Sequence, residues 1–266
     1  MKKHLLFALL MSALVTGGFT QDPETSNKEL VLASDIEWSP LNPARGDNSP
    51  KAANIWGDRT REGATGFLVQ FKKGFSSPPH IHNVTYRGIV ISGQMHNDDP
   101  QAANMWMPAG SYWTQPAGEA HITSAAGDFN MAYIEIQEGP YLVKPTDQAF
   151  DNGERPINME QSNMGWINGD EITWIKEKEV SVARLWNDSN SNITTSLVKL
   201  PEGFEGSIKS KNADLKAVVI QGSLNYSNET LAPGSYFGSQ GKGEHSISSK
   251  EETLLYIRSE GHYTIK

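Results

Sequence analysis

The chain has 266 residues, no cysteine and a formal net charge of −8. Without cysteine it can form neither disulfides nor thiolate metal sites, so any metal must be held by nitrogen or oxygen ligands. The acidic balance and the lack of a basic stretch argue against nucleic acid as a partner.

Residues 1–20 are typical of a secretory signal peptide. Lys2 and Lys3 precede an apolar run from Leu5 to Val15 that is short for a transmembrane helix, and small residues follow it. A retained membrane anchor is the alternative interpretation. We therefore expect a periplasmic or secreted protein with no membrane association beyond the export signal.

The rest of the chain consists of short apolar runs separated by turns rich in glycine and proline. These runs predict strands at 66–71, 131–136, 195–200, 215–220 and 253–258. Residues 80–91 form either one long strand or two short ones. No stretch has the periodicity and caps of a helix, so the sequence predicts an all-β fold of the sandwich or jelly-roll type.

A metal site is predicted by three histidines. His80 and His82 are two residues apart, so in a strand they point to the same face. His121 follows a Pro-x-Gly-x-x-His turn about one hairpin later. Three convergent imidazoles can hold a first-row transition metal. The alternative, three histidines with ordinary hydrogen bonds, suits an isolated histidine better than this combined pattern.

The two halves of the chain repeat each other, which indicates a duplicated β unit. The matching segments, in the same order in both halves, are Gly74-Phe75 with Gly203-Phe204, residues 89–93 with 218–222, residues 108–113 with 232–237, and His121 with His245.

The second copy is expected to lack the metal. At the spacing of the first two matches, His80 corresponds to Lys209 and His82 to Lys211. One imidazole with two nearby lysines holds a divalent metal poorly.

Two motifs resemble the cupin superfamily. Residues 74–82, followed by Gly93, resemble the first cupin motif, and residues 115–121 resemble the second. Together with the repeat, the chain resembles the poorly characterised exported bacterial bicupins. The resemblance implies two tandem double-stranded β-helix (jelly-roll) units: an N-terminal cupin with the metal site at 21–145, a linker at 146–173 and a degenerate cupin at 174–266.

The resemblance implies a divalent metal, for which we favour Fe over Zn, Mn, Ni or Cu. Cupins usually place a glutamate ligand four residues after the second histidine, where this chain has Tyr86. Strand alternation still points Tyr86 into the pocket. It could ligate the metal as a phenolate, hydrogen-bond a bound ligand or fill space. We favour a role outside the set of metal ligands, in which Tyr86 is the catalytic residue that bonds to the substrate or the oxygen species. The site then resembles the three-histidine iron sites of some cupin dioxygenases.

Three further side chains are candidates for orienting the ligands or lining the pocket. Gln115 lies just before the Pro-x-Gly turn, Glu135 lies on the last strand of the first unit, and His96 follows Gly93 by three residues. Each also has an ordinary structural interpretation.

The leading functional hypothesis is a metal-dependent, dioxygenase-like enzyme that cleaves a small oxygen-chelating substrate. Two alternatives stay open. One is a Lewis-acid metalloenzyme, such as an isomerase, lyase or hydrolase. The other is a non-catalytic ligand-binding or sensor cupin. The expected partners are a small-molecule substrate or ligand and, as an option, a second copy of the chain in a homodimer.

Overall fold

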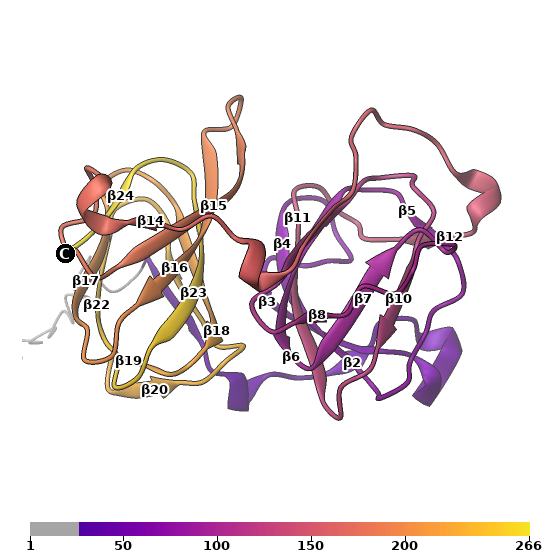
Figure 1. Ribbon diagram of the computed structural model, residues 1–266, viewed down its shortest axis with the longest axis horizontal. Helices are drawn as coiled ribbons and strands as arrows, with labels where there is room; N and C mark the ends of the chain where they lie inside the picture. The colour runs from indigo at the N-terminus through magenta and orange to yellow at the C-terminus, as the bar shows by residue number, and fades with distance from the viewer. Residues whose placement is uncertain (1–26) are drawn as a thin grey trace, which may run out of the picture.

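The computed structural model describes residues 27–266, so the predicted signal peptide lies outside the described residues. Two β-barrels lie side by side, the N-terminal one in indigo to magenta and the C-terminal one in orange to yellow (Figure 1). Each is a jelly roll, which confirms the prediction of two all-β units. Within residues 27–266, no helix is long and apolar enough to span a membrane.

The first barrel has a seven-stranded sheet in the order β13-β9-β6-β11-β4-β3-β2. The bounds are β2 (Ser39–Pro40), β3 (Lys51–Trp56), β4 (Thr65–Phe71), β6 (Tyr86–Ser92), β9 (Tyr112–Gln115), β11 (Asn130–Ile136) and β13 (Ile157–Met159). The facing layer consists of β5 (Ile81–His82), β7 (Gln94–Asp98), β8 (Met107–Pro108), β10 (Ile122–Ala125) and β12 (Val143–Lys144). The stretch 80–91 is thus two strands, β5 and β6, rather than one.

The second barrel repeats this plan. Its large sheet has the order β1-β21-β18-β23-β16-β15-β14, and its facing sheet the order β20-β19-β22-β17-β24. The bounds are β1 (Lys28–Val31), β14 (Ile167–Asn168), β15 (Ser181–Asp188), β16 (Ile193–Leu200), β17 (Glu205–Ser210), β18 (Leu215–Gln221), β19 (Leu224–Tyr226), β20 (Glu229–Leu231), β21 (Tyr236–Ser239), β22 (Gly243–Ser248), β23 (Thr253–Ser259) and β24 (Tyr263–Ile265).

Helical structure in residues 27–266 is limited to short 3₁₀ turns. They are η1 (Ala33–Asp35), η2 (Pro43–Asn48), η3 (Thr146–Gln148), η4 (Gln161–Asn163) and η5 (Gly169–Glu171).

The two barrels exchange their first strands. β1 precedes the first barrel but pairs with β21 of the second, whereas β13 precedes the second barrel and pairs with β9 of the first. We call β1 with η1, and β13 with η4, the exchanged arms. Both arms are fixed alike: the Ala33 amide donates to Ser235 Oγ at 3.0 Å, and the Gln161 amide donates to Ser111 Oγ at 3.1 Å.

The exchange changes the predicted domain boundaries. The segment 146–173 is more than a linker, because β13 extends the first sheet and β14 extends the second. Likewise, β1 lies within the predicted first unit but belongs to the second sheet. Edge strands with few residues carry little sequence signal, so their pairing partners cannot be read from the pattern alone.

The outer faces of the two large sheets pack on each other and bury a third core between the barrel interiors. Equivalent residues of the two copies meet there. The rings of Tyr133 on β11 and Tyr256 on β23 lie 5.0 Å apart between centroids. Two residues further along each strand, Glu135 and Arg258 form a buried ion pair at 2.9 Å. A continuous buried interface of this kind joins the barrels into one folded body.

Candidate metal centre

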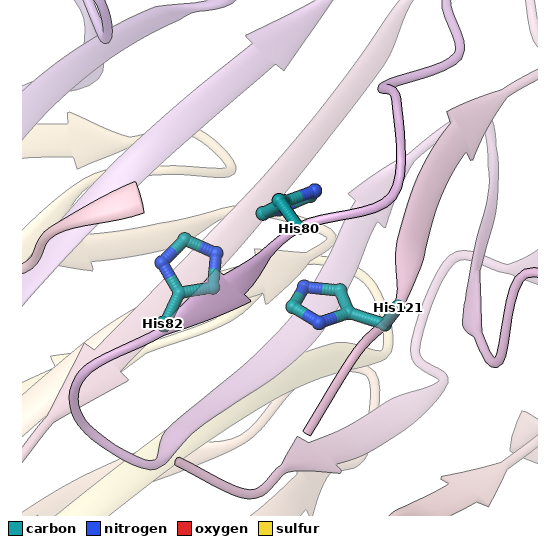
Figure 2. Close-up of side chains that lie close together, drawn as sticks. All are labelled: His80, His82 and His121. Atoms are coloured by element: carbon teal, nitrogen blue, oxygen red, sulfur yellow. The ribbon is translucent and has the colours of Figure 1, made fainter. Parts of the chain in front are cut away.

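The three motif histidines converge at one end of the first barrel. His82 lies on β5, and His80, just before it, forms an antiparallel bridge with His121. The three rings point toward one another (Figure 2). Their nearest nitrogens all lie within 4.8 Å of one another, and this is the only such group of potential ligands in residues 27–266. His82 and His121 are buried, and His80 is half-buried at the rim.

The turn before His121 requires glycine. Gly118 has a φ of +79°, which favours glycine, and a Cβ there would lie 2.4 Å from the carbonyl oxygen of Phe150. The Gly118 amide donates to the His82 carbonyl at 2.8 Å, which ties the turn to β5. The spacing of the second motif thus serves to bring His121 against His80 and His82.

Backbone carbonyls fix the orientation of all three rings. Nδ1 of His80 lies 2.9 Å from the Pro78 carbonyl, that of His82 3.0 Å from the Leu142 carbonyl, and that of His121 3.1 Å from the Glu119 carbonyl. A carbonyl only accepts, so each Nδ1 carries the proton and each Nε2 presents a lone pair. This is how metal-binding histidines are usually held.

The surroundings keep the imidazoles neutral. Burial lowers the pKa of His121 to about 3, with a further contribution from His80. Burial, and then the neighbouring His121 and His80, hold the pKa of His82 well below its usual range. Neutral imidazole is the form that binds a metal, so the rings are ready to ligate at neutral pH.

The donor set fits a divalent transition metal. Two imidazole nitrogens on one ion at ~2.1 Å can be at most about 4.2 Å apart. The observed limit of 4.8 Å is therefore within a small side-chain adjustment of ligation geometry. Three nitrogen donors without a thiolate suit Fe, Zn, Cu or Ni.

Tyr86 faces the histidines as a neutral phenol. Its hydroxyl donates to Asn97 Oδ1 at 2.7 Å and lies 3.1 Å from His121 Nε2. Burial raises its pKa above the ordinary value. Its single proton can be donated to Asn97 Oδ1 or to the lone pair of His121 Nε2, and a metal bound at Nε2 would leave it to Asn97. The raised pKa disfavours the phenolate alternative.

Asn97 is the centre of a polar network behind Tyr86. Its Oδ1 also accepts from Thr123 Oγ1 at 2.8 Å, and its Nδ2 donates to Gln115 Oε1 at 2.9 Å. Gln115 in turn donates at 3.4 Å to the Glu119 carbonyl, the same oxygen that holds Nδ1 of His121. Gln115 therefore reaches the site through Asn97 and through the carbonyl that orients His121. Asn97 was not among the candidates from the sequence, because no motif marks it.

Tyr141 is a second residue of the site that was not among the candidates from the sequence. Its ring stacks on His82 with centroids 4.2 Å apart, and its hydroxyl donates to His82 Nε2 at 3.0 Å. It comes from the segment between β11 and β12, which closes over β5. No motif marks it, because only the closing of this segment brings it to the site.

His96 and Glu135 lie elsewhere. On β7, Asn97 points into the barrel, so His96 points out; its Nδ1 accepts from the Met105 amide at 3.3 Å. Glu135 faces the second barrel, where it accepts from Tyr256 at 2.7 Å and from Arg258 at 2.9 Å. The suggestion that either residue borders the metal site is wrong, since both point away from the barrel interior.

The second copy lacks two of the three ligands, as predicted, but the residues that replace them differ from the predicted ones. His245 pairs with Ile208, just as His121 pairs with His80. Ile208, not Lys209, therefore replaces His80, and Ser210 replaces His82. Lys209 points outward and pairs with Glu244. Ile208 and Ser210 are both buried, so an apolar and a hydroxyl side chain fill the place of two imidazoles.

An apolar cavity of about 100 Å³ opens beside the histidines. Its lining residues are Leu41, Asn42, Arg45, Pro50, Val69, Phe71, Phe75, Ser77, Pro78, His80, His82, Tyr86, Trp113, Thr123, Ile134, Tyr141 and Val143. Trp113 fits because position 88 is glycine: a Cβ there would lie 2.0 Å from the indole ring. The cavity gives a small ligand room next to the ligand cluster.

A family model described as a domain of unknown function, DUF4437, matches residues 29–266. The chain belongs to the DUF4437 family. No curated protein matches this DUF4437 chain.

Solved structures show that this DUF4437 protein has the cupin fold. It is similar to a "putative dioxygenase" from Nostoc punctiforme, with a TM-score of 0.66 and 16% identity over 88% of this chain and 82% of that one. For a salicylate 1,2-dioxygenase from Pseudaminobacter salicylatoxidans, the TM-score is 0.54 and the identity 14%, over 85% of this chain and 76% of that one. For a pirin from Escherichia coli in complex with nickel(II), the TM-score is 0.53 and the identity 10%, over 87% of this chain and 98% of that one. At these identities the likeness concerns the fold.

Proposed function

We propose that this DUF4437 protein is an exported metalloenzyme that uses dioxygen to cleave a small oxygen-chelating substrate at His80, His82 and His121. The observation that carries the proposal is the convergence of three Nε2 lone pairs, each fixed by a carbonyl at Nδ1. The structures described as a "putative dioxygenase" and a salicylate 1,2-dioxygenase support it at the level of fold.

The charge of the site favours this chemistry. Three neutral imidazoles leave a divalent ion its full charge and several open positions. Bound iron would supply those open positions to a chelating substrate and to oxygen. No carboxylate lines the cavity to offset the charge. Such a centre favours a substrate that offers anionic or bidentate oxygen.

The protein's own residues would orient the substrate. Tyr86, with its proton held by Asn97, offers an acceptor to a hydroxyl or water at the ligand cluster. Tyr141, whose ring centroid lies 5.6 Å from that of Tyr86, offers a donor. The apolar walls exclude bulk water from the reacting atoms.

The first experiment is metal analysis of protein purified without chelators. We expect close to one transition metal per chain and its loss in a His82→Asn variant, with His262→Asn as the exposed control. A chain that neither contains nor takes up a metal contradicts the site.

The second experiment measures oxygen uptake by the iron-loaded protein with small diketones, phenolics and thiols. We expect uptake that matches substrate loss for one of these classes. An iron-loaded protein inert to all of them contradicts oxygen chemistry and favours a Lewis-acid or binding role.

A further inference from the structure

The cavity beside the histidines has one charged side chain on its wall, Arg45. Arg45 lies on η2, in the segment that leads to β3 and forms one side of the cavity. None of the ion pairs within residues 27–266 includes it. Arginine readily forms bidentate hydrogen bonds with carboxylates, so an unpaired guanidinium at a cavity is suited to an anion.

Arg45 is close to the ligand cluster. Arg45 and His80 line the same cavity, together with Ser77 and Asn42 on the polar side. The cavity therefore has the histidines at one place on its wall and a free cation at another.

The remaining wall is apolar. It is formed by side chains from β4, β9, β11 and the flanking segments, among them Val69, Phe71, Phe75, Trp113 and Ile134. These groups gain nothing from a strongly hydrated ligand but pack well against hydrocarbon. The volume of about 100 Å³ is below the ~150 Å³ of a cavity that holds benzene, so the apolar body that fits is smaller than a benzene ring, such as a short aliphatic chain.

From these observations we infer that the site binds a small monocarboxylate with an apolar body, and that Arg45 recognises its carboxylate. The inference rests on the proposed function in that it concerns the same site, and it adds the class of ligand that the site binds. Arg45 has no part in holding the metal; it determines which ligands enter and how they are oriented.

The test is calorimetric binding of butyrate and of its neutral isostere butyramide to the metal-free and zinc-loaded proteins. We expect butyrate to bind at least tenfold more tightly than butyramide. Arg45→Gln should weaken butyrate binding roughly tenfold, the scale of one charged hydrogen bond, and leave butyramide binding within twofold. Arg45→Lys should retain part of the preference. The control is Arg61→Gln, an exposed arginine paired with Asp58, which should change neither.

A second variant tests the cavity itself. Val143 is an exposed residue on its wall, so Val143→Trp should fold normally and weaken both probes by filling the entrance. Equal affinities for butyrate and butyramide, or unchanged butyrate binding by Arg45→Gln, would overturn the inference. Arg45-dependent binding without oxygen uptake by the iron-loaded protein would instead reject the oxygen chemistry and leave this inference standing.

Discussion

The three imidazoles are oriented without any acidic partner. Many metal-binding histidines donate Nδ1–H to a carboxylate, which adds negative charge near the ion. Here each Nδ1 is held by a neutral backbone carbonyl. The positive charge of a bound ion is therefore offset by its open-face ligand more than by the protein, which is why an anionic ligand suits the site.

Tyr141 competes with a metal for one of the three lone pairs. Its hydroxyl donates to His82 Nε2 at 3.0 Å. We expect Tyr141→Phe to bind zinc severalfold more tightly, because no hydrogen bond has to be broken first. Competition with a chromogenic chelator measures this. Tyr112→Phe, which removes a hydroxyl bonded to Thr114 in the core between the barrels, serves as control. Weaker zinc binding by Tyr141→Phe would contradict this role.

His245 makes the second barrel sensitive to acid. Burial lowers its pKa to about 4, helped by the charge of Lys28. Between its ordinary pKa near 6.5 and about 4, the unfolded chain binds a proton that the folded chain does not, so stability falls as the pH falls through that range. The contribution is on the order of 3 kcal/mol at neutral pH.

Urea unfolding of the metal-free protein tests this at pH 7 and pH 4.5. The free energy of unfolding of His245→Gln should fall less between the two values than that of the unaltered chain, by ~2 kcal/mol or more. Parallel losses in both proteins would show that His245 does not titrate in this window.

Among the residues of the site, the sequence predicted those that belong to motifs and not the others. His80, His82 and His121 follow from strand period and a glycine turn. Asn97 and Tyr141 reach the site only through the pairing of β7 with β10 and of β12 with β5. Single residues without a local pattern cannot be assigned before such pairings are known.

At the scale of elements, one additional residue in the first copy explains the error over Lys209. Ser76 pairs with Ser124, yet His80 pairs with His121, so the segment with Pro78 carries one residue more than its partner. In β17 the ladder runs on without a break to Ile208 and His245. A comparison of the two copies at constant spacing cannot detect such a bulge. Because inward and outward faces alternate with every residue, an error of one residue assigns an outward side chain to an inward position.

The exchanged arms should be held with equal strength. Ser111 and Ser235 are buried and accept from equivalent arm amides. We expect Ser111→Ala and Ser235→Ala each to cost about 1 kcal/mol of unfolding free energy, and the double variant about the sum, because the sites are separate. Each should also speed hydrogen exchange at its own arm, at Gln161 or Ala33. Faster exchange in the opposite arm would contradict the assignment.

At the scale of the whole molecule, the ion pair between Glu135 and Arg258 holds the barrels in register. Both side chains are almost fully buried. Arg258→Met leaves Glu135 without its cation, so we expect a loss of about 3–5 kcal/mol. Adding Glu135→Gln should restore part of it, since the remaining charge is removed. Urea unfolding of the two single variants and the double variant measures the coupling, and additive losses would contradict it.

The pair also has a consequence for how the two copies can differ. Tyr133 meets Tyr256 and, two residues on, Glu135 meets Arg258, as if each position faced its own counterpart across a twofold axis. In a dimer of identical subunits, a residue on the axis meets itself, so a glutamate would face a glutamate. One continuous chain is free of that restriction, because each copy can change alone. The same freedom allows one barrel to keep three histidines while the other places Ile208 and Ser210 where two of them would be.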